Sequence, residues 1–135
     1  MINSNNLEVK VSCIFCDYID SKNYIMENEL AFAIFDSYPV NKGHVLVMPK
    51  RHYSSYFDAT PGEVEALNDL FKKVKELLDA ELRPDGYNIG INIGEAAGQT
   101  IFHLHVHIIP RYSGDVDNPR GGIRKFKKPL VEYDG

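Results

Sequence analysis

The fold expected for this chain follows from one stretch of its sequence, His103-Leu104-His105-Val106-His107-Ile108-Ile109. Its histidines alternate with aliphatic residues, and alternation is typical of a β-strand, in which residues two apart point to one face. Three imidazoles are therefore expected in a row on one face, roughly 6.7 Å apart along the strand. The other face, formed by Leu104, Val106 and Ile108, is expected to be buried. We predict a strand over residues 101–109 that offers three titratable groups on a rigid element.

One long helix is expected in the middle of the chain. Thr60 and Glu63 match a capping box, and Pro61 suits the first helical position. Apolar residues then recur at helical spacing, at Val64, Leu67, Leu70, Phe71, Val74, Leu77 and Leu78. The sequence Pro84-Asp85-Gly86 is expected to end this helix.

Strands are expected on both sides of that helix. Aliphatic runs predict strands at residues 30–36, 44–48 and 87–93, and a short turn or helical stretch is expected at residues 13–19. The order of strands, one long helix and further strands indicates an α+β fold with an antiparallel sheet.

Size and composition narrow the class of protein. With 135 residues, 44% of them hydrophobic and 25% charged, the chain predicts a single domain with an ordinary core. A net charge of -4 argues against a general nucleic-acid binder. No apolar run reaches membrane-spanning length and residues 1–4 start no signal peptide, so we expect a cytoplasmic protein without a membrane partner. Residues 1–9 are expected to be loose, and residues 112–135 to form a basic C-terminal extension.

The histidine strand allows three interpretations. A purely structural role is disfavoured, because a solvated strand face would more cheaply carry Thr, Lys or Glu. The row of imidazoles could bind a catalytic metal, or one imidazole could attack an electrophile. The loop at residues 94–100 favours attack, because its glycines can expose backbone N–H groups and Gln99 and Thr100 add donors suited to phosphate oxygens.

At this point the chain resembles the histidine triad (HIT) superfamily of nucleotide hydrolases and transferases. The signature of that family alternates three histidines with hydrophobic residues, and residues 103–109 match it at every position. The resemblance runs from about Cys13 to Arg111. The related hexose-1-phosphate uridylyltransferases carry Gln where this chain has His107, so that branch is disfavoured. The resemblance implies a HIT-like α+β fold, with an antiparallel sheet of about five strands, one long helix and a short N-terminal helical segment.

The resemblance also implies roles for particular residues. His105 would attack the α-phosphorus of a nucleotide, His107 would contact the phosphate, and His44 would brace the triad. The implied substrate-binding residues are Asp36 for the ribose, Asn92, Gln99 and Thr100 for the phosphate region, and Ile14, Phe15 and Ile34 for the base. Each has a simpler alternative: Asp36 could cap the following loop, Asn92 and Gln99 could bond within loops, the apolar residues could be core, and His44 could lie at the surface.

The pair Cys13 and Cys16 is the other motif that carries chemistry. A thioredoxin-type redox motif would follow a strand, and nothing upstream of Cys13 suggests one. A structural zinc site needs four ligands, and the resemblance implies that His52 and His103 complete it. Cysteines that merely pack in the core remain the alternative. We expect one structural zinc ion and no organic cofactor.

The basic segment at residues 120–128 holds five cations in nine positions. Charge runs are usually solvated. The functional alternative is that Arg120 or Arg124 reaches the polyphosphate of a substrate, in the same chain or in a partner subunit, because the resemblance implies a homodimer.

These observations predict a homodimeric hydrolase that forms a nucleotidyl-histidine on His105 and releases a nucleoside monophosphate. Adenine nucleotides are the expected substrates, in particular a dinucleoside polyphosphate such as diadenosine tetraphosphate. A nucleoside phosphoramidate or aminoacyl-adenylate is the alternative substrate. A nucleotide-binding regulatory module and a zinc hydrolase that uses the triad as ligands are the alternatives outside this chemistry.

Overall fold

A computed structural model describes residues 13–127, and the expectation for residues 1–9 lies outside this range. The core element is a five-stranded antiparallel sheet in the order β1-β2-β3-β5-β4. The strands are β1 (Met26–Glu27), β2 (Ala31–Phe35), β3 (Val45–Pro49), β4 (Gly86–Gly90) and β5 (Val106–Arg111). The predicted α+β fold with an antiparallel sheet of about five strands is confirmed.

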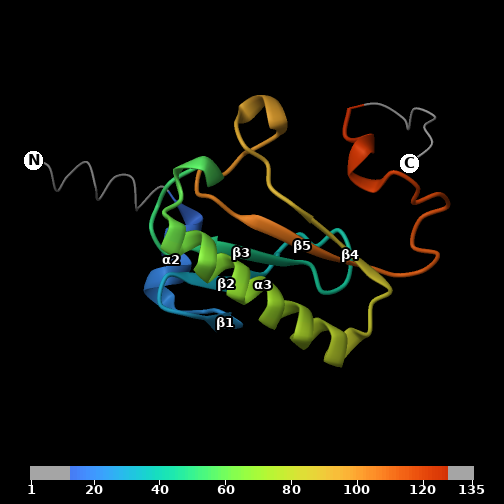
Figure 1. The fold of residues 1–135 in the computed structure, drawn as a ribbon, viewed down its shortest axis with the longest axis horizontal. Coiled ribbons are helices and arrows are strands. Elements are labelled where there is room, and N and C mark those ends of the chain that lie inside the picture. The colour runs from blue at the N-terminus through green and yellow to red at the C-terminus, as the bar shows by residue number, and fades with distance from the viewer. Residues whose placement is uncertain (1–12, 128–135) are drawn as a thin grey trace, which may run out of the picture.

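The long helix α3 (Pro61–Leu82) crosses one face of this sheet (Figure 1). Its capping box forms as predicted, with Thr60 and Glu63 each accepting a hydrogen bond from the other's backbone N–H. The helix ends at Leu82 because Arg83 takes the left-handed conformation. The buried apolar residues of α3 pack on the sheet, and they include Ala66, which is not part of the predicted apolar stripe. Glu63 is also buried, and its carboxylate accepts from Arg51.

The short helix α2 (Ile14–Ser21) covers part of the opposite face. Phe15 and Cys16 are its buried residues, and they pack with Phe32 and Ile34 of β2 and neighbouring residues of β3. The predicted N-terminal helical segment is therefore confirmed. Two layers of apolar residues thus enclose the sheet, one under α3 and the other under α2.

The histidine segment departs from the predicted strand at its start. Regular pairing begins only at Val106, so His103 and His105 precede β5 and only His107 lies within the strand. Pro49 ends the neighbouring strand and has no N–H to donate, and the N–H of Leu104 instead donates to the carbonyl of Tyr53 at 2.6 Å. The prediction of a strand from residue 101 is wrong for this reason, although Leu104, Val106 and Ile108 are buried as expected.

The end of β5 and the end of β4 also differ from the sequence prediction. Strand β5 continues through Pro110 to Arg111, because at this point it pairs only with β4 and no longer with β3. Strand β4 ends at Gly90, three residues before the expected end.

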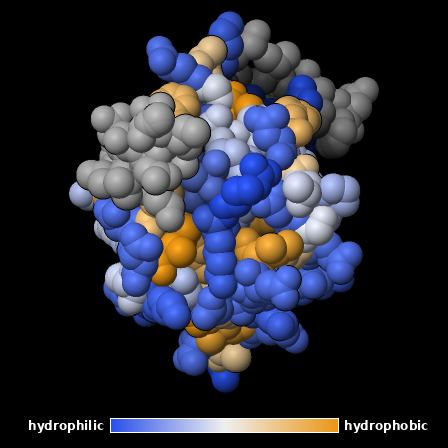
Figure 2. Space-filling model, turned by 90° about the vertical axis from the view of Figure 1, so that its left-hand side faces the viewer, coloured by the Kyte–Doolittle hydropathy of each residue, from blue (hydrophilic) through white to orange (hydrophobic). Residues whose placement is uncertain are grey.

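After β5 the chain turns back and forms the short 3-10 helix η3 (Gly122–Lys125), which lies at the end of the molecule opposite α2 (Figure 1). On the α2 side, apolar side chains reach the surface in separate patches divided by hydrophilic residues (Figure 2). Within residues 13–127, no helix is long and apolar enough to cross a membrane.

Candidate active site and metal centre

His105 lies on the sheet face opposite α3, and its ring orientation is fixed by the chain itself. Its Nδ1 donates to the backbone carbonyl of His103 at 2.8 Å. A carbonyl oxygen can only accept, so the proton of the neutral ring sits on Nδ1 and Nε2 keeps its lone pair. This arrangement presents Nε2 of His105 as a nucleophile.

His44 and His107 form a directed hydrogen-bond chain beside that nucleophile. The backbone N–H of Val40 donates to Nδ1 of His44 at 3.1 Å. Nε2 of His44 therefore carries the proton of the neutral ring and donates to Nδ1 of His107 at 2.9 Å. His107 must then carry its own proton on Nε2, which makes that atom a donor for a phosphate oxygen.

The surroundings keep these supporting rings neutral. Burial, with smaller contributions from nearby His105 and His44, lowers the pKa of His107 to about 4, while Asp36 opposes the change. Burial also lowers the pKa of His44, again against Asp36. Neutral rings at pH 7 are required for the hydrogen-bond chain, because a doubly protonated imidazole could not accept at Nδ1.

Asp36, His44 and His107 also lie close enough to share a metal ion. Two nitrogen ligands on one tetrahedral zinc are about 3.3 Å apart, whereas Nε2 of His44 and Nδ1 of His107 are 2.9 Å apart. That separation is typical of a hydrogen bond. The geometry favours a proton-donating chain over a catalytic metal.

Among the residues expected to hold the nucleoside, Phe15 contacts His105 on the α2 side. The ring of Phe15 lies 4.9 Å from that of His105, and Ile34 is buried beneath α2. Ile14 is more than half exposed. Asp36 accepts from the N–H of Tyr38 at 2.9 Å, so it does cap the following loop, while its second oxygen lies 3.4 Å from Nε2 of His44.

The loop before the histidine segment is closed by Gln99. Its side-chain oxygen accepts from the N–H of Gly94, and its amide nitrogen donates to the carbonyls of Ser54 and Ile101. Because these bonds use both amide protons, Gln99 shapes the loop here and would have to break one bond to hold a phosphate. Gly98 has φ +93 in this turn, a conformation that favours glycine. Thr100 remains exposed.

The second cluster brings Cys13, Cys16, His52 and His103 together, with one possible ligand atom from each lying within 4.8 Å of the others. Cys13 and Cys16 come from the start of α2, His52 follows β3, and His103 precedes β5. His103 is fully buried, and burial lowers its pKa to about 4. Its Nε2 donates to the carbonyl of Pro49 at 2.8 Å, which leaves the lone pair of Nδ1 directed at the cluster.

The distances in this cluster fit a tetrahedral ion. Nδ1 of His103 lies 3.5 Å from Sγ of Cys13 and 3.6 Å from Sγ of Cys16. Nδ1 of His52 lies 3.3 Å from Sγ of Cys16 and 3.2 Å from Nδ1 of His103. Ordinary zinc bond lengths place sulfur and nitrogen ligands about 3.6 Å apart and two nitrogens about 3.3 Å apart. The four residues therefore fit a structural zinc site.

Comparison with known proteins identifies the family. The HIT domain matches residues 20–114. The chain belongs to the HIT domain family. An uncharacterized HIT-like protein of Methanocaldococcus jannaschii is 44% identical over 84% of this chain and 86% of that protein. The crystal structure of a Zn-bound histidine triad family protein from Mycobacterium smegmatis is 36% identical, with a TM-score of 0.71 over 78% of this chain and 79% of that chain.

Two HIT relatives carry names that state an activity. The adenylylsulfatase of Arabidopsis thaliana is 34% identical over 76% of this chain and 54% of that protein. The AP-4-A phosphorylase of Mycobacterium tuberculosis is 36% identical over 69% of this chain and 48% of that protein. Enzymes of the HIT family act on phosphoanhydride and phosphoramidate bonds, so the site belongs to a family of nucleotide hydrolases and transferases.

The resemblance implies that a backbone carbonyl of the same strand region fixes the ring of the attacking histidine, and His103 supplies that carbonyl. Sequence reasoning missed the backbone groups that orient His44 and His103. The N–H of Val40 and the carbonyls of Pro49 and His103 fix three histidine tautomers. Backbone groups leave no signal in the residue types, so only the folded chain could identify them.

Proposed function

We propose that this protein hydrolyses adenine nucleotides at the α-phosphate through a covalent nucleotidyl-histidine on His105. The observation that carries the proposal is the bond from Nδ1 of His105 to the carbonyl of His103, which leaves Nε2 unprotonated and directed away from the backbone. A nucleophile held in its reactive tautomer needs no separate base to remove a proton before attack.

The reaction divides into two displacements at phosphorus. Nε2 of His105 bonds to the α-phosphorus while the bond to the leaving group breaks, and the leaving group keeps the electron pair. Water then breaks the bond between phosphorus and His105 and releases a nucleoside monophosphate. Nε2–H of His107, oriented by His44, donates to the phosphate as negative charge develops.

The nucleoside is assigned to the α2 side of the site. Asp36 would hold the ribose hydroxyls, and Phe15, Ile34 and the exposed Ile14 would contact the base. Asn92, which follows β4, and Thr100 would lie by the phosphate. Three substrate classes share this chemistry and differ in the leaving group: dinucleoside polyphosphates such as diadenosine tetraphosphate, nucleoside phosphoramidates and aminoacyl-adenylates.

One zinc ion is proposed at Cys13, Cys16, His52 and His103, in agreement with the tetrahedral distances. Bound there, zinc would supply a structural clamp between α2 and the sheet. A homodimer is proposed as well, since β4 pairs only with β5 and is an edge strand of the described sheet.

The decisive experiment measures AMP release by the full chain and by His105→Ala. Diadenosine tetraphosphate, adenosine phosphoramidate and adenylyl-lysine serve as substrates, and acid- or base-quenched samples are analysed for AMP bound to protein. We expect turnover and a base-stable adduct in the wild type, and a loss of at least about 10³-fold in the variant, as for removal of other catalytic nucleophiles.

Phe57→Ala provides a matched control, because Phe57 is a highly exposed residue outside the proposed site. Equal rates for wild type and His105→Ala would overturn covalent catalysis. Nucleotide binding without AMP release by the wild type would instead support a binding module.

A further inference from the structure

One peptide unit decides how the ring of His105 is held. The bond between His103 and Leu104 carries the carbonyl of the first residue and the N–H of the second, and in a planar trans peptide these groups point in opposite directions. The carbonyl accepts from Nδ1 of His105 at 2.8 Å, and the N–H donates to the carbonyl of Tyr53 at 2.6 Å. Because the two groups turn together, Tyr53 sets the direction of the carbonyl that fixes the ring of His105.

The residue that supplies this outer carbonyl is the middle one of three consecutive residues that all contact the segment before β5. Nδ1 of His52 lies 3.2 Å from Nδ1 of His103. The carbonyl of Ser54 accepts from the side-chain amide of Gln99 at 3.0 Å. Residues 52–54 therefore form a brace along this segment, and a shift of the brace would turn the peptide unit that it holds.

The brace is anchored by Arg51, the residue before it. The guanidinium of Arg51 donates to both carboxylate oxygens of Glu63, at 2.8 and 3.0 Å, and to the backbone carbonyl of Asp58 at 3.0 Å. The same group lies over the ring of Tyr53, 4.1 Å from its centroid. A planar guanidinium can make two parallel hydrogen bonds and stack on an aromatic ring at the same time, which an ammonium cannot. Arg51 therefore joins the brace to the first turn of α3.

The ion pair is fixed at its buried end, although the side chain of Arg51 is about half exposed. Glu63 is only 4% exposed, and the oxygen that accepts from Arg51 at 2.8 Å also accepts from the N–H of Thr60. Hydrogen bonds, led by those from Arg51, lower the pKa of Glu63 to about 2 against the effect of burial. A buried carboxylate needs its cation, since an unpaired buried charge is strongly unfavourable.

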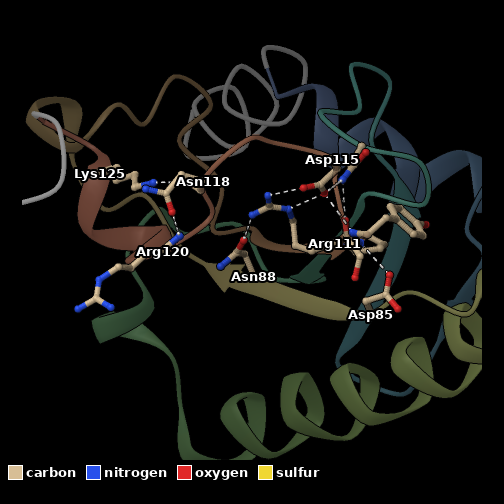
Figure 3. Close-up of polar contacts among 11 residues, drawn as sticks. Asp85, Asn88, Arg111, Asp115, Asn118, Arg120 and Lys125 are labelled. Carbon is tan, nitrogen blue, oxygen red and sulfur yellow. Dashed lines mark hydrogen bonds and ion pairs between the residues drawn. The ribbon is translucent and has the colours of Figure 1, made fainter. Parts of the chain in front are cut away.

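A second arginine makes a similar ion pair without a connection to His105. Arg111 donates two hydrogen bonds to Asp115, at 2.8 and 2.9 Å, and one to Asn88 (Figure 3). These contacts hold the turn that follows β5, at the opposite end of that strand from His105. Of these two ion pairs, only that of Arg51 adjoins residues bonded to the peptide unit behind the nucleophile.

We propose that Arg51, held by Glu63, is a positioning residue for the attacking histidine. It acts through Tyr53, whose carbonyl turns the peptide unit so that the proton of His105 stays on Nδ1 and Nε2 remains free to attack. The inference rests on the proposed function. Tyr53 belongs to the core layer under α3, whereas His105 lies on the opposite face of the sheet, with the assigned nucleoside side. Loss of the ion pair should therefore lower kcat and leave KM unchanged.

The test compares the double variant Arg51→Met/Glu63→Gln with the wild type, using adenosine phosphoramidate as substrate. This variant leaves no buried charge unpaired, and the glutamine can still accept from the N–H of Thr60. We expect kcat and the rate of adduct formation to fall by up to about 10²-fold, the effect of misplacing a reacting group by about 1 Å. KM and zinc content should stay at the wild-type values. Arg51→Lys keeps the charge without the planar fork, so its kcat should fall less.

Thr60→Ala is the matched control, because it weakens the start of α3 and leaves the ion pair in place. Its kcat should equal that of the wild type. An equal fall of kcat in Thr60→Ala and in the double variant would overturn the inference, since the effect would then follow from the stability of α3. A loss of zinc in the double variant would also overturn it, because the effect would then pass through His52.

A spectroscopic measurement separates this inference from the proposed function. Proton–nitrogen NMR of labelled histidine in the substrate-free protein, about two pH units above the ordinary histidine pKa, shows which ring nitrogen of His105 carries the proton. His105→Ala assigns the signal. We expect the proton on Nδ1 in the wild type and in Thr60→Ala, and a mixture of tautomers in the double variant. An unchanged tautomer or an unchanged kcat in the double variant would overturn the positioning role. A changed tautomer in the double variant, with no AMP release by the wild type, would overturn the proposed hydrolase alone.

Discussion

Two histidine clusters lie a few residues apart along one segment, and they use the same side chain in different ways. At the proposed metal centre, Nδ1 of His103 and Nδ1 of His52 face two cysteines, with neighbouring atoms 3.2–3.6 Å apart. At the proposed active site, His44 and His107 form a chain of hydrogen bonds that leaves a proton on Nε2 of His107. In each cluster, the partner of the second ring nitrogen therefore determines whether the imidazole offers a lone pair or a proton.

The largest effect is expected from breaking the metal cluster. Cys16→Ala removes one of four ligands, so bound zinc should fall from about one per chain to a small fraction, with a loss of several kcal/mol of stability. Elemental analysis and urea unfolding measure both quantities. Lys22→Ala is a suitable control, because Lys22 is an exposed residue next to the same helix. A fully folded, metal-free wild type would contradict the zinc proposal.

A second variant breaks the proton-donating chain and leaves the metal cluster intact. His44→Ala removes the donor that fixes the tautomer of His107. We expect a fall in kcat/KM of about 10²-fold, at the lower end of the effect of a positioned proton donor. Zinc content should stay at the wild-type value. Steady-state kinetics and elemental analysis on the same preparation test both expectations, and a loss of zinc would show that the clusters are not separate.

The pH dependence of stability tests whether His107 is neutral in the folded chain. Since the pKa of His107 is lowered to about 4 from 6.5, the unfolded chain binds a proton there between these values and the folded chain does not. The free energy of unfolding should therefore fall as the pH is lowered through this window. His107→Asn removes the effect of this residue, so its loss of stability between pH 7 and pH 5 should be smaller than that of the wild type by about 1 kcal/mol, because the ring is partly screened. Urea unfolding at both pH values measures the difference, and equal losses would contradict a neutral His107.

The smallest effect is expected away from both clusters. Thr60→Ala removes the side chain that caps α3, and it should cost about 1 kcal/mol without changing zinc content or kcat/KM. Thermal unfolding together with the two functional measurements tests this. A change in turnover would mean that α3 influences the catalytic face more directly than the packing indicates.

Local patterns were sufficient to predict most of the elements, whereas the resemblance to a known family implied the members of the two clusters. The capping box at Thr60 and the alternation at residues 103–109 act over short distances, so they located α3 and the buried face of β5. The separation of His103 from the other two histidines depends on Pro49 and Tyr53, which meet the segment only in the folded sheet. The local pattern assigned Glu63 only to the cap of α3, because its ion pair with Arg51 joins two segments that meet only in the folded chain.

His103 belongs to both clusters, since its side chain faces the metal site while its carbonyl accepts the proton of His105. Spacing along this segment is therefore constrained as strictly as residue type. One inserted residue between His103 and His105 would turn the nucleophile toward α3, because neighbouring residues in an extended chain face opposite sides. In a library of insertions and deletions, we expect the protein to tolerate length changes in the turn at residues 112–118 but none within residues 103–107. The segment of residues 103–107 can therefore diverge only by substitution.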